Sequence, residues 1–216
     1  MNLAWYEENS VSIDGSVGID EVGRGPLAGP VVAACVWICY PLAMEMKHNS
    51  LVVRDSKKMT TNQRKGVIDW IKLQPSQKIQ YSIASVTVEE IDEINILKAT
   101  LRAMERSYNL LNIPAEYVLV DGNVAPTIPT AAVQAIVKGD SKVLSIALAS
   151  IIAKEYRDDF MRKLALRYPD YGWKTNVGYG SKEHLEAISR YGITPYHRKT
   201  FMPVKASMEN NKKIDY

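Results

Sequence analysis

Short apolar runs alternate with longer amphipathic stretches along this chain, and the pattern predicts strands interleaved with helices. The run of Val17, Gly18 and Ile19 suits a buried strand that stops at two acids. Residues 31–40 are rich in Val, Cys, Trp and Ile and predict a second buried strand, ended by Pro41 and followed by a polar stretch. Further strands are predicted at residues 79–86, 117–120 and 133–137.

Capping signals mark where helices begin. Thr60 with Gln63 forms a capping-box pattern and predicts a helix over about residues 61–73. Thr87 with Glu90 repeats the pattern and opens one long amphipathic helix that ends before Pro114. Its apolar positions recur at three-four spacing: Ile94, Leu97, Leu101, Met104, Tyr108 and Leu111.

The second half of the chain predicts two more helices. One carries an apolar stripe of Ile146, Ala149, Ala153, Tyr156, Phe160 and Leu164. A loop over residues 168–180 leads to Ser181, which caps a helix that stops at Gly192. Residues 195–203 are expected to be irregular, and the polar tail from Ser207 is expected to fray. The whole pattern predicts an α/β fold with a mixed central sheet and helices on its faces.

Composition narrows the class of protein. The 216 residues suit one large domain, and 46% hydrophobic with 24% charged residues is ordinary globular composition. Residues 174–205 hold six basic and two acidic side chains, which indicates a polyanionic partner or a solvated basic face. No apolar run is long enough to span a bilayer, and we see no signal peptide, so a cytosolic, cytoplasmic protein is expected.

The two cysteines, Cys35 and Cys39, lie in the second strand. Four residues apart in extended chain, their Cα atoms would be about 13 Å apart. A disulfide needs less than about 7 Å, so free thiols in a reducing compartment are expected.

Three predicted strands end in acids. Asp20 and Glu21 follow the first strand, Asp121 follows the fourth, and Asp140 comes shortly after the fifth. Because sites of open α/β sheets form outside the carboxyl ends of strands, these acids are expected to converge. Oxygen donors without His or Cys suit Mg²⁺ or Mn²⁺, and two such ions suit hydrolysis of a phosphodiester.

Each acid also has a simpler interpretation. Asp20 and Glu21 could close a strand in an exposed turn, Asp121-Gly122 is a common turn pair, and Asp140 could cap the following helix. Consecutive strand residues point to opposite faces. Glu21 therefore reaches the same site as Asp20 only if the strand breaks, or else contributes from the side or through its backbone carbonyl.

A glycine-arginine-glycine segment follows the first pair of acids. Gly23 and Gly25 flank Arg24, so backbone N–H groups can approach a ligand where no Cβ stands in the way. The segment predicts a phosphate-sized slot beside a cation site.

These residues resemble a known family, ribonuclease HII, the bacterial type 2 ribonuclease H, over about residues 15–205. The resemblance rests on segments in the family's order: GIDEVGRGPLAGP, DSKK, EINILKAT, YVLVDGN, KGDSK, ASIIAKEYRD, GYGSKEHLEAI and YGITPYHRKTF. It implies a ribonuclease H-like fold at about residues 15–170, a C-terminal helical extension at about 171–206 and a frayed tail at about 207–216, within one catalytic domain.

The resemblance also implies an activity and a site. It implies endonucleolytic cleavage of RNA in RNA–DNA hybrids and on the 5′ side of single ribonucleotides in duplex DNA. It places this activity in DNA replication and repair. The partners that it implies are the RNA–DNA hybrid and the ribonucleotide-containing duplex, and we expect a monomer that binds no membrane. The residues carried over as metal ligands are Asp20, Glu21, Asp121 and Asp140. Those carried over or considered for substrate binding are Gly23, Arg24, Gly25, Lys57, Tyr179, His184 and Arg198.

Some of these assignments keep alternatives. His184 orients Tyr179, lines the groove or simply packs. His197, beside Arg198 and Lys199, is expected to belong to a solvated basic patch that touches phosphate. For Asp158 the alternatives are an ion pair that holds its helix and a catalytic role. For the whole protein, the alternatives are another nuclease of the same fold, such as a junction resolvase, or a hybrid-binding module without activity.

Overall fold

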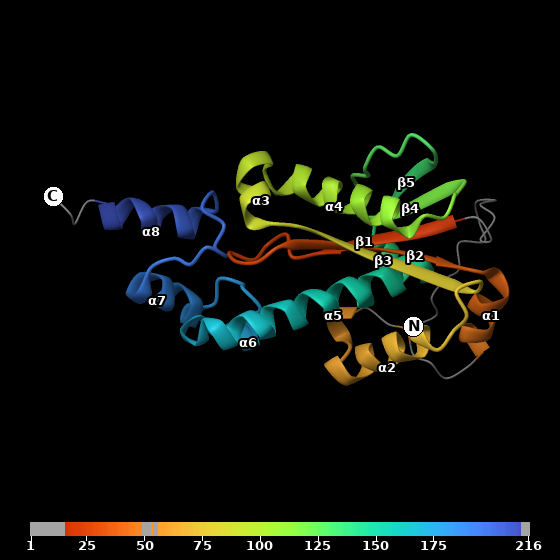
Figure 1. Cartoon of the computed structure of the whole chain (residues 1–216), viewed down its shortest axis with the longest axis horizontal. Coiled ribbons are helices and arrows are strands. Elements are labelled where there is room, and N and C mark those ends of the chain that lie inside the picture. Colours follow the sequence, from red (N-terminus) through yellow and green to blue (C-terminus); the bar gives the residue numbers. More distant parts are fainter. Residues whose placement is uncertain (1–15, 49–52, 54–55, 213–216) are drawn as a thin grey trace. The chain divides into compact units, whose positions relative to one another are not determined.

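The computed structural model of the chain describes residues 16–48, 53 and 56–212 (Figure 1). Its strands are β1 (Ser16–Val22), β2 (Val31–Ile38), β3 (Ile79–Val86), β4 (Tyr117–Asp121) and β5 (Ala132–Ile136). Its α-helices are α1 (Tyr40–His48), α2 (Thr61–Lys72), α3 (Val88–Ile94), α4 (Ile96–Leu111), α5 (Leu144–Arg167), α6 (Trp173–Asn176), α7 (Lys182–Tyr191) and α8 (Met202–Lys212). Short 3₁₀ turns are η2 (Ser56–Lys58), η3 (Gly139–Ser141) and η4 (Pro169–Tyr171). None of these helices is long and apolar enough to cross a membrane.

The chain divides into two compact units. The sheet unit comprises Met1–Val22, Val32–Ser85 and Thr100–Glu155. The second unit comprises Gly23–Val31, Val86–Ala99 and Tyr156–Tyr216. The division of one catalytic domain at about residue 170 stays a prediction.

The sheet has the order β3-β2-β1-β4-β5. β1 pairs antiparallel with β2 and parallel with β4, which in turn pairs parallel with β5. This is the mixed sheet that the sequence predicts. β1 stands in the middle, so the acids at its end lie between two neighbouring strands.

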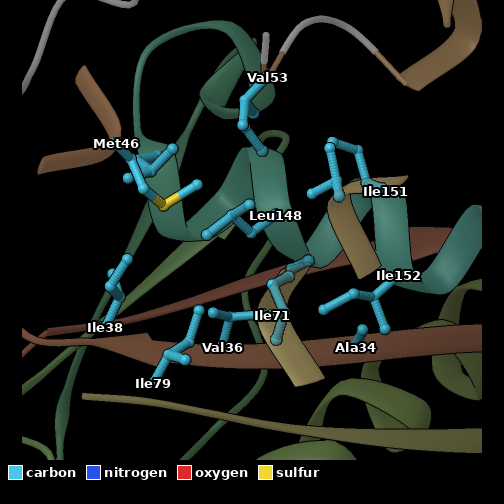
Figure 2. Close-up of a cluster of buried hydrophobic side chains, with 14 of the residues drawn as sticks. Ala34, Val36, Ile38, Met46, Val53, Ile71, Ile79, Leu148, Ile151 and Ile152 are labelled. Atoms are coloured by element: carbon cyan, nitrogen blue, oxygen red, sulfur yellow. The ribbon is translucent and has the colours of Figure 1, made fainter. Parts of the chain in front are cut away.

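Alternate residues of β2 build the main core. Its even-numbered side chains face α1, α2 and the first half of α5, and ten residues of this cluster are labelled in Figure 2. The helices contribute Leu42, Met46, Val67, Ile71, Leu148, Ile151 and Ile152. Figure 1 shows α4 on the opposite side of the strands, and the hydroxyl of Ser82 in β3 donates to the carbonyl of Ser107 in α4 at 2.5 Å. The sheet is therefore covered on both faces.

The capping signals in the sequence are confirmed. Thr60 with Gln63 opens α2 and Thr87 with Glu90 opens α3, each as a complete capping box. The Ser181 hydroxyl accepts from the His184 N–H at the start of α7, and the helix ends at Gly192 with φ +78°. Cys35 and Cys39 are free, as expected.

The long helix predicted after Thr87 is wrong at one position. Asn95, with φ +68°, separates α3 from α4. Its side-chain oxygen accepts hydrogen bonds from the N–H groups of Leu97 and Lys98 at 3.0 and 3.1 Å. The apolar period continues across this break, but an asparagine that tolerates positive φ and caps the next helix interrupts the hydrogen bonding.

Two other segments near the start differ from expectation. β1 does not stop at Asp20 but continues to Val22, because Asp20 and Glu21 pair with Ala34 and Ala33 of β2. The polar stretch expected after Pro41 begins with α1, which buries an apolar face on the core. Proline is compatible with a first helical turn, where its missing N–H has no helical partner.

The second unit has an aromatic core of its own. Trp173, fully buried, stacks on Tyr171 with ring centroids 5.1 Å apart. The cluster includes Leu27, Met161, Leu164, Ile188 and Val204. The segment predicted as a loop, residues 168–180, contains η4 and α6. Tyr171 of η4 and Trp173 of α6 pack their rings into this core. Val204 of α8 is also fully buried. The frayed tail predicted from Ser207 is wrong for residues 207–212, which continue α8. Residues 213–216 lie outside the described residues.

Candidate active site

The pairing of β1 and β4 places Asp20 beside Asp121. Ile19 lies opposite Val120 in the parallel register, and the next residue on each strand is an aspartate. Neighbouring strands are about 4.8 Å apart, and residues opposite each other point to the same face. Two carboxylates therefore meet at the carboxyl end of the sheet, as expected.

Asp20 is buried within a network of hydroxyl groups. Its carboxylate accepts from the Glu21 N–H at 2.7 Å and from the hydroxyl of Ser150 in α5. The Ser150 hydroxyl is 2.9 Å from that of Ser56. Burial raises the pKa of Asp20 well above its ordinary value, and repulsion from Glu21 and Asp121 raises it further. These acids share one electrostatic environment.

Glu21 takes the other face of β1. Because the strand is unbroken here, Asp20 lies on the side of Ala34 and Glu21 on the side of Ala33. The arrangement in which both side chains enter one site through a strand break is therefore wrong. Glu21 is left with a contribution from the side or through its backbone carbonyl.

Asp121 organises the turn that carries Asp140. One oxygen of Asp121 accepts from the N–H of Gly139 at 2.6 Å and from that of Asp140 at 3.4 Å. The turn begins at Lys138, whose φ of +58° reverses the chain after β5. α5 begins only at Leu144, so Asp140 does not cap that helix. The half-exposed Asp140 is thus tied to Asp121 through the backbone.

The chemistry of the donors fits a hard divalent cation. All four predicted ligands are carboxylates, the donors that Mg²⁺ and Mn²⁺ prefer. Across the described residues, no three His, Cys, Asp or Glu side chains are already arranged as the ligands of one ion. The repulsion that raises the pKa of Asp20 is nevertheless the effect that a cation between these carboxylates would relieve.

Within the second unit, the glycine-arginine-glycine segment meets Tyr179. Arg24, Gly25 and Tyr179 are exposed, and Tyr179 is 47% accessible. A Cβ added to Gly25 would lie 3.4 Å from Cε1 of Tyr179. The segment and the ring predicted to read the sugar therefore form one exposed surface.

Arg198 and His197 do not form the expected solvated patch. Both are fully buried. The Arg198 guanidinium donates to the carbonyls of Gly23, Arg24 and Gly29. The expectation of direct phosphate contact by Arg198 is wrong, because its guanidinium faces these carbonyls away from solvent.

His184 is buried and does not line a groove. Its Nδ1 is 2.8 Å from the carbonyl oxygen of Tyr179. Its Nε2 is 3.0 Å from Nε2 of His197 and accepts from Nε1 of Trp173, also at 3.0 Å. Of the roles considered for His184, packing and orientation of Tyr179 match this geometry.

Lys57 is exposed on η2, while Arg54 and Asp55 of the same segment lie outside the described residues.

The sequence pattern did not single out Arg157. It is fully buried in α5 and donates to the carbonyls of Ala28, Pro30 and Val177. The predicted stripe of α5 included Tyr156, which is exposed. The buried stripe instead passes from Ala153 through Arg157 to Met161, at four-residue spacing. The position of an arginine between apolar residues at four-residue spacing was the feature of the sequence that could have indicated a buried arginine.

Comparison with known proteins identifies the family of this chain. The sequence profile of the family described as Ribonuclease HII matches residues 17–204. A ribonuclease HII of Thermosynechococcus vestitus is 49% identical over 189 residues, which cover 86% of this chain and 83% of that protein. One of Pelagibacter ubique is 44% identical over 190 residues, covering 87% and 95%. The crystal structure of a ribonuclease H2 from Pyrococcus horikoshii aligns with a TM-score of 0.75 and 29% identity, covering 92% of this chain and 99% of that one. The chain therefore belongs to the ribonuclease HII family, and it is a metal-dependent ribonuclease H hydrolase.

Proposed function

We propose that this enzyme, a ribonuclease H acting on RNA–DNA hybrids, also cuts duplex DNA on the 5′ side of a single embedded ribonucleotide. The observation that carries the proposal is the exposed surface of Gly25, Arg24 and Tyr179. Polar groups close to the 2′-hydroxyl can distinguish ribose from deoxyribose, and an aromatic ring can pack on the neighbouring sugar. This surface offers both, at a place where glycine leaves room for the sugar.

The proposed chemistry is hydrolysis with an ordinary water molecule as nucleophile. Asp20, Asp121 and Asp140, with Glu21, would hold two divalent cations, Mg²⁺ or Mn²⁺. When bound, the cations would supply Lewis-acid stabilisation of the charge that develops on phosphate. The bond from phosphorus to the 3′-oxygen breaks, that oxygen takes up a proton, and the products carry 3′-hydroxyl and 5′-phosphate ends.

The chain's own residues prepare the acids for this role. The Ser150 hydroxyl and the Glu21 N–H orient the carboxylate of Asp20, and the N–H groups of the η3 turn orient that of Asp121. Lys57 and Arg24 supply exposed positive charge for phosphates of the duplex. We further expect action as a monomer in the cytoplasm, in removing ribonucleotides during DNA replication and repair.

The decisive experiment offers three duplexes of one sequence: plain DNA, DNA with one ribonucleotide, and a continuous hybrid. Each is incubated without metal, with Mg²⁺ and with Mn²⁺, and the product ends are mapped. We expect metal-dependent cleavage of both ribonucleotide-containing duplexes and none of plain DNA. If the enzyme cleaves the continuous hybrid but leaves the single-ribonucleotide duplex intact, the ribonuclease H activity stands and the proposed cleavage at single ribonucleotides is wrong.

A further inference from the structure

Two buried guanidinium groups lie behind the glycine-arginine-glycine segment. Arg198 donates from Nε to the Gly29 carbonyl at 3.0 Å and from Nη1 to the Arg24 carbonyl at 2.9 Å. Its Nη2 donates to Gly23 at 2.5 Å and again to Gly29 at 2.8 Å. The planar fork thus fixes three carbonyls of one short segment at once.

Arg157 completes the support from the other end. Its Nε donates to the Pro30 carbonyl and its Nη2 to the Ala28 carbonyl, each at 3.0 Å. Its Nη1 donates to the Val177 carbonyl at 2.9 Å, two residues before Tyr179. One guanidinium therefore ties the segment to the turn that carries the tyrosine, and the Leu27 N–H adds a bond to the Gly178 carbonyl at 2.8 Å.

These contacts come at an energetic cost. Both guanidiniums are fully buried, and burial lowers the pKa of Arg157 to about 10 and that of Arg198 to about 9, which leaves both charged at neutral pH. Two buried like charges are less favourable than apolar side chains of similar volume. Their benefit is geometric, because a planar donor fork can hold several carbonyls in one arrangement and an apolar side chain cannot.

We propose that Arg157 and Arg198 are positioning residues that hold residues 23–25 in the backbone shape able to read a ribose 2′-hydroxyl. The inference rests on the proposed function and assigns it a structural origin. The exposed Arg24 and Gly25 meet the nucleic acid, while the two buried arginines determine where their backbone groups point. Neither buried arginine touches the substrate itself.

The test uses Arg198→Lys and Arg157→Lys, which keep the charge but lose the planar fork. Arg167→Lys, an exposed position on the same helix as Arg157, is the matched control. Affinity is measured by fluorescence anisotropy in EDTA for the single-ribonucleotide duplex and for DNA of the same sequence. We expect the ratio of the two affinities to fall about tenfold in the test variants, as for loss of one good hydrogen bond, and not in the control.

A purely structural role would give a different result. Partial unfolding lowers the active fraction and reduces both affinities by the same factor, so the ratio stays at the wild-type value, and that result would overturn the proposal. If wild type itself fails to prefer the ribonucleotide duplex, the proposed function fails instead. The two failures are therefore distinguishable.

A measurement on the wild-type protein covers the case in which the variants do not fold. Trypsin cleaves after exposed arginine, and Arg24 is exposed while its carbonyl is held by Arg198. We expect the Arg24–Gly25 bond to be cut no faster than the protein unfolds globally under the same conditions. Rapid cleavage there in the folded protein would show a loose segment and would also overturn the proposal.

Discussion

His184 and His197 are joined through their Nε2 atoms, 3.0 Å apart, and the contacts of their Nδ1 atoms determine which nitrogen of each ring carries the proton. The Thr194 N–H donates to Nδ1 of His197 at 2.9 Å, so His197 carries its proton on Nε2. It donates that proton to Nε2 of His184, which donates in turn from Nδ1 to the Tyr179 carbonyl at 2.8 Å. The chain of hydrogen bonds needs both rings neutral, and it ends on the backbone of the exposed tyrosine.

The histidine pair predicts acid sensitivity of folding. Burial, and then the neighbouring His184, lower the pKa of His197 to about 4, against about 6.5 in an unfolded chain. Between these pH values the unfolded state binds more protons at His197 than the folded state does. The contribution of the neutral ring to the free energy of unfolding is therefore complete above about pH 6.5 and is lost as pH falls towards 4. We expect His197→Gln to flatten the dependence of the urea unfolding free energy on pH in this window. Parallel curves for wild type and variant would contradict the assignment.

The acid cluster predicts a separation of activity from stability. Asp20→Asn and Asp121→Asn should each abolish cleavage while the fold persists, because asparagine keeps an oxygen acceptor for the neighbouring N–H groups. Without metal, the melting temperature should hold or rise slightly, since a buried charge and its repulsion from the other acids are removed.

The control is Asp69→Asn, an exposed helix position whose partner Lys72 is 3.8 Å away and also exposed. It should leave cleavage unchanged. Calorimetry in EDTA and cleavage at saturating Mg²⁺ provide the two readouts. Near wild-type turnover of either active-site variant would exclude these acids as essential ligands.

The two glycines of the segment should behave differently when replaced by alanine. Gly23 has φ +93°, and a Cβ there would lie 2.3 Å from Nε of Arg157, so Gly23→Ala should lower the unfolding free energy by about 1–3 kcal/mol. At Gly25 the nearest atom is 3.4 Å away, in the Tyr179 ring, so Gly25→Ala should fold normally. It should nevertheless lose activity on both ribonucleotide-containing substrates, because the added methyl group occupies the exposed surface. Equal stability of the two variants in urea would argue against the buried guanidinium contact.

Salt dependence tests the exposed cations. Each lysine or arginine that neutralises a phosphate contributes roughly one unit to the slope of log affinity against log salt concentration. We expect Arg24→Ala and Lys57→Ala each to reduce that slope by about one. Lys72→Ala, an exposed lysine on α2, should leave it unchanged. An unaltered slope in either test variant would remove that side chain from the phosphate contacts.

The fold was predictable wherever local chemistry decides it. Capping boxes at Thr60 and Thr87 mark real helix starts, and Ser181 and Gly192 bound α7. The apolar period continues across Asn95, so it could not reveal the break between α3 and α4. The break depends on the Asn95 side chain, which caps α4. Nor could the apolar period reveal α1, whose few buried residues follow a proline.

The acids of the site were predictable because they lie at the ends of strands. Sheet register explains why Asp20 and Asp121 meet, and the sequence indicated that Glu21 would face away on a regular strand. Burial was harder to infer. Arg157 and Arg198 belong by residue type to the surface, and only the carbonyls of a distant segment explain why they are buried.

The last prediction concerns the ring of Tyr179. It is exposed beside Gly25 while its backbone is fixed by His184, so its removal should disturb the surface without disturbing the fold. If the ring packs on the sugar next to the ribonucleotide, Tyr179→Ala should slow cleavage of a single embedded ribonucleotide more than that of a continuous hybrid. Tyr179→Phe should retain the wild-type ratio, because the ring remains. Tyr191→Ala, at another exposed tyrosine, is the control. The measured quantity is the ratio of kcat/KM on the two substrates at fixed salt and metal. If Tyr179→Ala slows both substrates by the same factor, the ring is a general packing element and has no role in reading the junction.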